Sequence, residues 1–134
     1  MNCLFCKIIA KEIPAEVVYE DGTVIAILDI TPVNPGHVLV LPKKHVRNIF
    51  DIEPEDWKEV MERVRLLSPA VREASAAEGI NIHVNNEPAA GQIIFHSHVH
   101  IIPRYEGDGR EHWHGKQATS EELRVMREKI TRAL

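Results

Sequence analysis

The first third of the chain carries short apolar segments separated by turn residues. The polar turn Glu20-Asp21-Gly22-Thr23 lies between two apolar runs and predicts a β-hairpin. Pro32, Pro35 and Gly36 interrupt the chain before the next apolar run, which Pro42 ends. Together these patterns predict one helical turn and three strands, at 4–10, 17–19, 24–28 and 37–41.

The middle of the chain carries apolar residues at steps of three and four. This spacing predicts a long amphipathic helix, and it involves Trp57, Val60, Met61, Val64, Leu67 and Val71. Asp51 or Glu53 is expected to cap the helix, because Pro54 suits a first helical turn. Pro69 is expected to kink or divide it, and Gly79 to end it.

Two more strands and a helix are expected in the last part of the chain. Alternation predicts strands at about 80–85 and 93–102, with a loop at 86–91 between them. Thr119-Ser120-Glu121-Glu122 has capping-box spacing and predicts a helix that runs to about Arg132. We therefore expect a single α+β domain over 1–134, an antiparallel five-stranded meander with the long helix packed on one face. Residues 107–134 form a C-terminal loop and helix extension.

Composition excludes several classes of function. The 134 residues carry a net charge of −4, which argues against broad nucleic-acid binding. The apolar runs are too short to span a bilayer, and the start of the chain lacks the form of a signal peptide. We therefore expect a cytoplasmic protein without membrane or nucleic-acid partners, whose two cysteines are reduced or bound to a metal.

Three histidines alternate along the last predicted strand. Because successive side chains point to opposite faces, His96, His98 and His100 share one face, about 6–7 Å apart. The opposite face, with Phe95 and Val99, is expected to meet the core. A neutral imidazole is a good nucleophile toward phosphorus at neutral pH. Two other interpretations are a polar face that is merely rich in histidine, and a metal site without chemistry.

At these residues the chain resembles the histidine triad (HIT) nucleotide-binding proteins, in particular the Hint-like branch with Cys-x-x-Cys near the start. The His-x-His-x-His signature is followed by two apolar residues. The resemblance covers residue 3 to about 109. It includes Phe5-Cys6-Lys7-Ile8-Ile9, Glu12-Ile13-Pro14, Tyr19-Glu20-Asp21, Leu28-Asp29-Ile30, Gly36 to His45, Gly91-Gln92 and His96 to Arg104.

The resemblance implies a homodimer with joined sheets and cleavage at the α-phosphate of a nucleotide. Dinucleoside polyphosphates and adenosine phosphoramidates are the implied substrates, with a purine base expected. It makes His98 the nucleophile, through a nucleotidyl-histidine intermediate. His100 and His37 would hydrogen-bond the phosphate oxygens. Asn85 and Gln92 would orient the phosphate and the leaving group.

The resemblance also implies a nucleoside pocket. Asp29 matches the carboxylate that binds the ribose, although such a residue more often serves a turn. The apolar base slot would be formed by Leu4, Phe5, Ile8, Ile27 and Ile30, which without the resemblance would be read as plain core. Ile93 stands where family members often carry Ser or Thr. It has no hydroxyl to donate to a leaving amine, so a polyphosphate leaving group is favoured over an amine.

Cys3 and Cys6 have the spacing of a zinc knuckle, but a second such pair is missing nearby. In the related galactose-1-phosphate uridylyltransferases, zinc is held by such a pair and two histidines, which match His45 and His96 here. A closed Cys₂His₂ site would be structural. Two reduced thiols or a redox pair are the alternatives.

The resulting hypothesis is a HIT-family hydrolase or nucleotidyl transferase that works through His98. A nucleotide-binding regulatory or adaptor protein with little catalysis is the second hypothesis, and Ile93 favours it. A metal-storage or metal-transfer protein is the third, but it leaves Asn85, Gln92 and Asp29 without a role.

Overall fold

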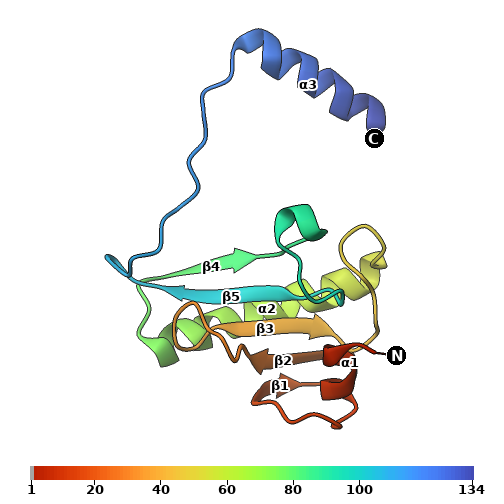
Figure 1. Ribbon diagram of the computed structural model, residues 1–134, viewed down its shortest axis with the longest axis vertical. Coiled ribbons are helices and arrows are strands. Elements are labelled where there is room, and N and C mark those ends of the chain that lie inside the picture. The colour runs from red at the N-terminus through yellow and green to blue at the C-terminus, as the bar shows by residue number, and fades with distance from the viewer. Residues whose placement is uncertain (1) are drawn as a thin grey trace.

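The computed structural model describes residues 2–134 as a sheet with helices on both faces and a C-terminal arm (Figure 1). This confirms the expected α+β class. In chain order the elements are α1 (Leu4–Ile9), β1 (Val17–Glu20), β2 (Val24–Leu28), β3 (Val38–Pro42), α2 (Pro54–Ser75), β4 (Gly79–His83), η1 (Pro88–Ala90), β5 (Val99–Arg104) and α3 (Ser120–Ala133). Within the described range, no helix has the length and apolar character needed to cross a membrane.

The five strands form one antiparallel sheet in the order β1-β2-β3-β5-β4. The first three strands form a meander, but β5 then pairs with β3, and β4 lies outside it. In this respect the sheet departs from a simple meander. Leu39 and His83 are the Cα partners of His100 on its two sides. The centre of the sheet therefore presents His100 between two neighbours, and β4 is an edge strand.

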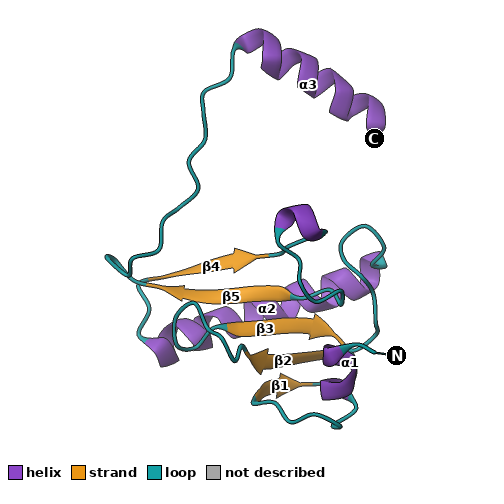
Figure 2. Cartoon of the chain, viewed as in Figure 1, coloured by secondary structure: helices purple, strands orange, loops and turns teal. Residues whose placement is uncertain are grey.

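Both faces of the sheet are covered (Figure 2). On one face α2 packs through Val60 and Val64 against a cluster that includes Val40 and Ile101. On the other face the N-terminal segment packs through Phe5 and Ile8. This second layer buries side chains from the same strands, namely Ile25, Ile27, Leu39 and Leu41. The central strands are therefore apolar on both faces.

Helix α2 is a single helix of 22 residues, so Pro69 does not divide it. Pro69 has no N–H to donate to the carbonyl of Arg65, four residues earlier. Both residues lie on the exposed side of the helix, where water can bond this carbonyl instead. The helix also ends before Gly79, which instead begins β4. Ala76 adopts the left-handed conformation of the cap, with φ of 53°. A glycine usually takes this left-handed cap position, and the prediction therefore chose Gly79 and placed the end of α2 too late.

Strand β5 begins at Val99, not at Ile93 as expected. His96 and His98 therefore belong to the loop before the strand, and only His100 lies on it. The expected core face is also incomplete, because Phe95 is 37% exposed under the guanidinium of Arg47. Both His96 and His98 are buried, at 0% and 9% exposure, because the N-terminal helix covers them. The prediction that all three histidines share one face of a strand is therefore wrong, because only His100 belongs to the strand.

The C-terminal helix α3 begins as expected. The Thr119 hydroxyl accepts a hydrogen bond of 3.2 Å from the backbone N–H of Glu122. A long linker carries α3 away from the sheet on the side of β4 (Figure 1).

Candidate active site

A pocket of about 410 Å³ opens between the N-terminal helix, the end of β2 and the loop before β5. Its volume lies within the range of about 300–1,000 Å³ that is typical of ligand sites. The predicted base slot, the predicted ribose carboxylate and two of the three triad histidines line it together. Ten of the predicted residues are among its lining, namely Leu4, Phe5, Ile8, Ile27, Asp29, Ile30, Asn85, Ile93, His98 and His100.

His98 has one ring nitrogen committed to the backbone. Its Nδ1 lies 2.7 Å from the carbonyl oxygen of His96. A carbonyl only accepts hydrogen bonds, so Nδ1 carries the proton and Nε2 carries the lone pair. Burial lowers the pKa of His98, so the ring is neutral at pH 7. This arrangement leaves the lone pair of the ring on Nε2 of His98, which lines the pocket.

His37 and His100 form a chain of hydrogen bonds that also begins at the backbone. The N–H of Val33 donates to Nδ1 of His37 over 3.1 Å. Nε2 of a neutral His37 therefore carries the proton and donates to Nδ1 of His100, 2.9 Å away. His100 in turn carries its proton on Nε2. His100 lines the pocket, and His37 lies behind it.

Burial is the main cause of the low pKa values in this pair. It lowers the pKa of His100 to about 4, with the His98 and His37 rings adding to the effect. Burial lowers the pKa of His37 as well, against the opposing charge of Asp29. Both rings are thus neutral at pH 7 and present fixed N–H donors rather than positive charges.

Asp29 serves a turn and the pocket at once. Its Oδ1 accepts hydrogen bonds from the backbone N–H and the hydroxyl of Thr31, at 2.9 and 3.2 Å. Its Oδ2 lies 3.6 Å from Nε2 of His37. The turn fixes the carboxylate at the rim, where it faces the pocket.

A second cluster lies on the other side of Phe5. Cys3, Cys6, His45 and His96 bring four possible metal-ligand atoms together. Nδ1 of His45 lies 3.2 Å from Nδ1 of His96 and 3.3 Å from the sulfur of Cys6. Each sulfur lies 3.7 Å from Nδ1 of His96. Tetrahedral zinc would place two nitrogens about 3.4 Å apart and sulfur about 3.6 Å from nitrogen. The four donors therefore fit the group.

The tautomer of His96 supports the same fit. Its Nε2–H donates to the carbonyl of Pro42 over 2.7 Å, which leaves the lone pair on Nδ1, facing the two thiols. Burial, together with the neighbouring Cys3 thiol, raises the pKa of the Cys6 thiol. A cation is needed to bring such a thiol into its ligating, deprotonated form.

Asp29, His37 and His100 also lie close enough together to suggest a metal site. The tautomers argue against one. A metal on Nε2 of His37 would move the ring proton to Nδ1, directly opposite the N–H that Val33 donates. This group is better suited to hydrogen bonding than to metal binding.

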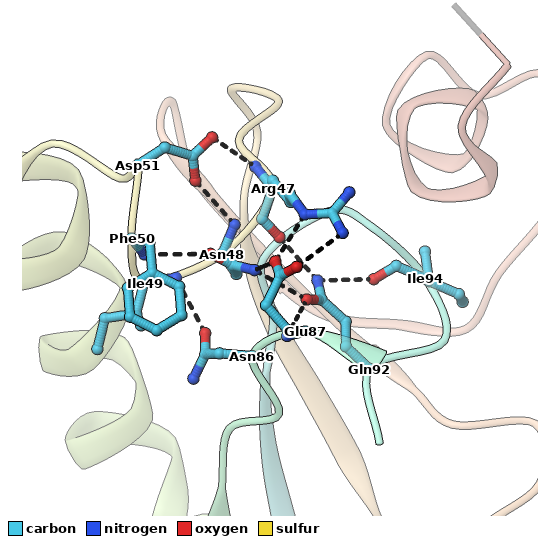
Figure 3. Close-up of polar contacts among 9 residues, drawn as sticks. All are labelled: Arg47, Asn48, Ile49, Phe50, Asp51, Asn86, Glu87, Gln92 and Ile94. Atoms are coloured by element: carbon cyan, nitrogen blue, oxygen red, sulfur yellow. Dashed lines mark hydrogen bonds and ion pairs between the residues drawn. The ribbon is translucent and has the colours of Figure 1, made fainter. Parts of the chain in front are cut away.

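Gln92, like His37, is a predicted site residue that does not line the pocket. Its Oε1 accepts hydrogen bonds from the backbone N–H of Glu87 at 2.8 Å and from Nδ2 of Asn48 at 3.0 Å. Its Nε2 donates to the carbonyls of Arg47 and Ile94 (Figure 3). The side-chain amide is buried and fully occupied by protein partners.

The same network fixes the loop that carries Gln92. Arg47 forms a bidentate ion pair with Glu87, with N–O distances of 2.7 and 3.0 Å (Figure 3). Glu87 has φ of 78°, a conformation that costs energy for any residue but glycine. Gly91, with φ of 90°, completes the turn beside Asn85. The network thus stabilises a strained loop that supplies Asn85 and Ile93 to the pocket.

Several residues outside the predicted set of site residues also line the pocket. Gly91 and Ile94 come from the loop, and Leu39 comes from the centre of β3. The remaining ones follow the N-terminal helix or flank Asp29, namely Ile13, Pro14, Ala15, Leu28 and Thr31. The burial of Leu39 could have been predicted, because it alternates with Val38 and Val40 along a strand whose two faces are both apolar.

Comparison with known proteins gives a consistent result. The HIT domain family model matches residues 10–107. The chain is 48% identical over 109 residues to "Protein hit" of Bacillus subtilis, covering 81% of this chain and 75% of that protein. It is 43% identical over 107 residues to adenylylsulfatase HINT3 of Arabidopsis thaliana, covering 80% of this chain but only 54% of that longer protein.

Solved structures extend the likeness to the whole chain. A crystal structure from Streptococcus mutans has a TM-score of 0.94 at 40% identity, covering 99% of this chain and 86% of the other. A HIT-family crystal structure from B. subtilis has a TM-score of 0.93 at 40% identity, covering 100% and 98%. A zinc-bound histidine triad protein from Mycobacterium smegmatis has a TM-score of 0.79 at 35% identity, covering 99% and 96%. The family-model match and these relatives show that the chain belongs to the HIT domain family.

Proposed function

We propose that this protein binds a nucleotide and cleaves it at the α-phosphorus through a covalent intermediate on His98. The observation that carries the proposal is the tautomer of His98. Nδ1–H of His98 donates a hydrogen bond to the carbonyl oxygen of His96 over 2.7 Å, and this leaves the lone pair of the neutral ring on Nε2, at the pocket. A ring in this state needs no further activation to attack phosphorus.

The reaction divides into two displacements. In the first, Nε2 of His98 forms a bond to phosphorus while the bond from phosphorus to the leaving group breaks, and the leaving group takes the electron pair. In the second, water attacks the same phosphorus, the P–N bond breaks, and its electrons return to Nε2. The released proton passes to solvent, and a nucleoside monophosphate leaves.

His100 and Asn85 would stabilise the charge that grows on the phosphate oxygens. His100 offers an Nε2–H that the relay from Val33 through His37 holds in place. The apolar residues around Phe5 and Ile27 would hold the base, and Asp29 would accept from the ribose hydroxyls. Gln92 would act by holding the loop rather than by touching the substrate.

The leaving group is expected to depart as a stable anion. Ile93 lines the pocket, is 86% exposed and offers no side-chain proton. An amine leaving group needs a proton, whereas a sulfate or a polyphosphate does not. One relative is named as an adenylylsulfatase. We therefore propose acid anhydrides, namely adenylyl sulfate and dinucleoside polyphosphates, as better substrates than phosphoramidates.

Zinc at Cys3, Cys6, His45 and His96 is the second part of the proposal. The donor separations fit a tetrahedral ion, and a zinc-bound relative is known. Four protein ligands leave no position for substrate, so the ion would supply structural stabilisation. It would join the N-terminal helix to the loop that carries His98.

A homodimer is the third part. Strand β4 is an edge strand, with Ile82 on it 41% exposed. An exposed edge of this kind can pair with another strand. We propose that β4 pairs with its copy, so that two sheets become one.

The central experiment traps the intermediate. Wild-type protein is mixed with adenylyl sulfate or diadenosine polyphosphate, quenched in acid, and weighed by mass spectrometry. We expect a nucleotidyl adduct on His98 and a loss of turnover of at least about 10³-fold in His98→Ala. His83→Ala is the matched control, because it removes an imidazole on β4 to which the mechanism assigns no role.

Two outcomes would contradict the proposal. One is full turnover in His98→Ala. The other is tight nucleotide binding by the wild type with neither turnover nor an adduct, which would support a regulatory binding protein instead.

A further inference from the structure

A polar network joins the loop before His37 to the end of β5, and the chemistry proposed above assigns it no role. The loop connects β2 to β3 and includes Val33 and Asn34. The other side of the network is the turn at 105–110, which directly follows the strand that carries His100. The match to the family model stops at residue 107, so Asp108, on which the network centres, lies outside it.

The carboxylate of Asp108 is 7% exposed and accepts five hydrogen bonds from residues that the structure describes. Two come from the guanidinium of Arg104, at 2.8 and 3.1 Å. Two come from the backbone N–H groups of Tyr105 and Arg110, at 3.2 and 3.0 Å. The fifth comes from Nδ2 of Asn34, at 3.0 Å. These donors, Arg104 above all, hold the pKa of Asp108 far below its usual range, so the carboxylate is a permanent acceptor at neutral pH.

The turn brings Asp108 back onto the strand that it follows. Gly107 and Gly109 have φ of 71° and 79°, in the left-handed region that glycine adopts without strain. The N–H of Asp108 also donates to the carbonyl of Tyr105 over 3.2 Å, which closes the turn. The carboxylate therefore faces the guanidinium of Arg104, four residues earlier.

The turn reaches the loop through two side chains. The amide of Asn34 donates both to Asp108 and, over 2.8 Å, to the carbonyl of Pro103 on β5. The guanidinium of Arg110 donates to the carbonyl of Val33 over 2.9 Å. An ion pair that merely ended β5 would not need either contact. The loop is therefore held, at two successive residues, from the end of the sheet's central strand.

The position of the Val33 N–H decides the tautomer of His37. This N–H donates to Nδ1 over 3.1 Å, so the neutral ring keeps its proton on Nε2. The Asp29 carboxylate lies 3.6 Å from Nε2, beyond ordinary hydrogen-bond distance, and favours the same tautomer only weakly. His100 then accepts on Nδ1 and carries its own proton on Nε2. One backbone N–H thus determines which nitrogen of His100 is a donor.

Loss of that N–H would reverse the whole relay. With its proton on Nδ1, His37 would accept at Nε2, and His100 would donate to it from Nδ1. Nε2 of His100 would then carry a lone pair, which repels phosphate oxygens. The bond from Val33 already lies near the long end of the usual range of about 2.7–3.2 Å, so a small outward displacement of the loop would break it.

We propose that Asn34, Asp108 and Arg110 are positioning residues, which hold Val33 in place so that His100 offers an N–H to the α-phosphate. The inference rests on the proposed function for the identity of that phosphate. The tautomers themselves are a property of the free protein. They can therefore be measured whether or not the chain turns over a nucleotide.

Long-range ¹H–¹⁵N spectra of the full chain test the proposal without substrate, because they distinguish protonated from unprotonated ring nitrogens. In the wild type we expect the protons of His37 and His100 on Nε2. In the double variant Asn34→Ala/Arg110→Ala, which releases Val33, the tautomer with both protons on Nδ1 should appear at about 10% or more. Arg110→Ala alone changes only an exposed side chain and should show a smaller shift in the same direction.

Asn81→Ala is the matched control. It removes a hydrogen bond of 2.6 Å to the guanidinium of Arg104, but on the side of β4 and away from the loop. It should leave both tautomers as they are in the wild type. The amides of α2 report whether each variant is folded.

Turnover gives the second measurement. The double variant should lower kcat about tenfold, a part of the 10²–10³-fold lost when such a donor is removed outright, and leave KM within about twofold. The proposal is overturned if neither the double variant nor Arg110→Ala moves the protons, or if Asn81→Ala moves them as far. It is also overturned if the protons move and kcat does not fall. A wild type without any turnover would instead contradict the proposed function, and the spectra would still decide the role of the network.

Discussion

His96 and His98 are separated by one residue, yet their imidazoles carry the ring proton on different nitrogens. His96 gives Nε2–H to the carbonyl of Pro42 and turns the lone pair of Nδ1 toward two thiols. His98 gives Nδ1–H to the carbonyl of His96 and keeps the lone pair of Nε2 for the pocket. Phe5 packs edge-on against both rings, with centroids 5.9 and 5.1 Å away. One aromatic ring thus separates the candidate metal cluster from the candidate catalytic histidines.

The difference lies in which ring nitrogen the backbone binds. Spacing along the sequence places the two histidines near each other, but an imidazole has two nitrogens with opposite properties in the neutral state. A single carbonyl acceptor decides which of them faces the site. The experiments below test this division of roles, beginning with the metal cluster.

Loss of the metal cluster should have the largest effect. We expect Cys6→Ser to abolish binding of one zinc per chain and to lower the free energy of unfolding by at least about 3 kcal/mol. Elemental analysis and urea unfolding with and without chelator measure both quantities. His112→Ala should change neither. Wild-type protein that contains no zinc and gains no stability on adding it would contradict the assignment.

The second-largest expected effect is a loss of stability in acid, caused by the buried histidines His37, His98 and His100. Burial holds the pKa of His100 at about 4, below its ordinary value of 6.5, so the unfolded chain binds more protons between these two pH values. The stability is therefore full above pH 6.5 and falls as the pH drops toward 4, by about 3 kcal/mol from His100 alone. The lowered pKa values of His37 and His98 act in the same direction, and the Asp29 carboxylate opposes them.

Urea unfolding at a series of pH values measures this slope. His100→Gln should make the slope shallower, and the difference from the wild type isolates the contribution of this one ring from that of the metal ligands. His114→Gln, in the exposed linker, is the control and should leave the slope unchanged. An unchanged slope in His100→Gln would mean that the ring is not held neutral by burial.

The network around Gln92 connects the two regions, because Arg47 and Asn48 follow the metal-ligand candidate His45 by two and three residues. Gln92→Met removes the acceptor of the Glu87 N–H and one of the two acceptors of Asn48 Nδ2, which keeps its hydrogen bond to the Glu87 carboxylate, at a cost of about 1–3 kcal/mol. We expect KM for the nucleotide to rise about tenfold, with a smaller change in kcat and faster hydrogen exchange over residues 86–94.

A second pair of variants controls for charge. Glu87→Gln weakens the ion pair with Arg47 and should loosen the same loop to a lesser degree. Glu62→Gln removes an equally paired carboxylate from an exposed site on α2 and should change neither KM nor exchange. If Gln92→Met lowers kcat while the loop stays protected, Gln92 contacts the substrate and does not merely position the loop.

Ile93→Ser should have the smallest effect, and it sharpens the assignment of the leaving group. Ile93 is exposed, so the change should alter the stability by no more than about 0.5 kcal/mol. The new hydroxyl should raise kcat/KM for adenosine phosphoramidate several-fold while leaving diadenosine polyphosphate unchanged. Ile30→Ser removes another exposed isoleucine of the pocket rim and should not discriminate. Equal changes on both substrates would rule out a role in proton donation.

Much of this fold could be predicted from local patterns. The three-and-four spacing predicted α2, and the polar turn at Asp21 predicted the first hairpin. The start of α3 followed from Thr119, whose hydroxyl caps it. These elements depend on interactions within a few residues, which the sequence displays directly.

The strand boundary before the histidines depends on interactions far along the chain. Residues 93–98 alternate like a strand, but the backbone N–H of Ser97 donates to the carbonyl of Val46, and the His96 ring faces Cys3 and Cys6. These partners lie about 50 and 90 residues away, so the alternation could not reveal them. The burial of His96 follows from the same contacts.

The pocket itself was predictable in composition but not in detail. Ten predicted residues line it, and the family resemblance identified most of them, because the residue pattern alone would have placed the apolar ones in the core and Asp29 in a turn. Gln92 was expected among them and is bound by Arg47, Asn48, Glu87 and Ile94 instead. An amide side chain can satisfy the protein or the ligand, and only the fold decides which.

The position of Phe5 has a practical consequence for the design of truncated forms of this protein. The family model begins at residue 10, after the short helix that bears Phe5. A fragment cut to residues 10–107 would retain all three alternating histidines. It would nevertheless lose both thiols, and it would lose the Phe5 ring that separates His96 from His98. Residues 2–9 precede the segment that the family model matches, yet Phe5 lines the pocket, and Cys3 and Cys6 belong to the thiol–histidine cluster.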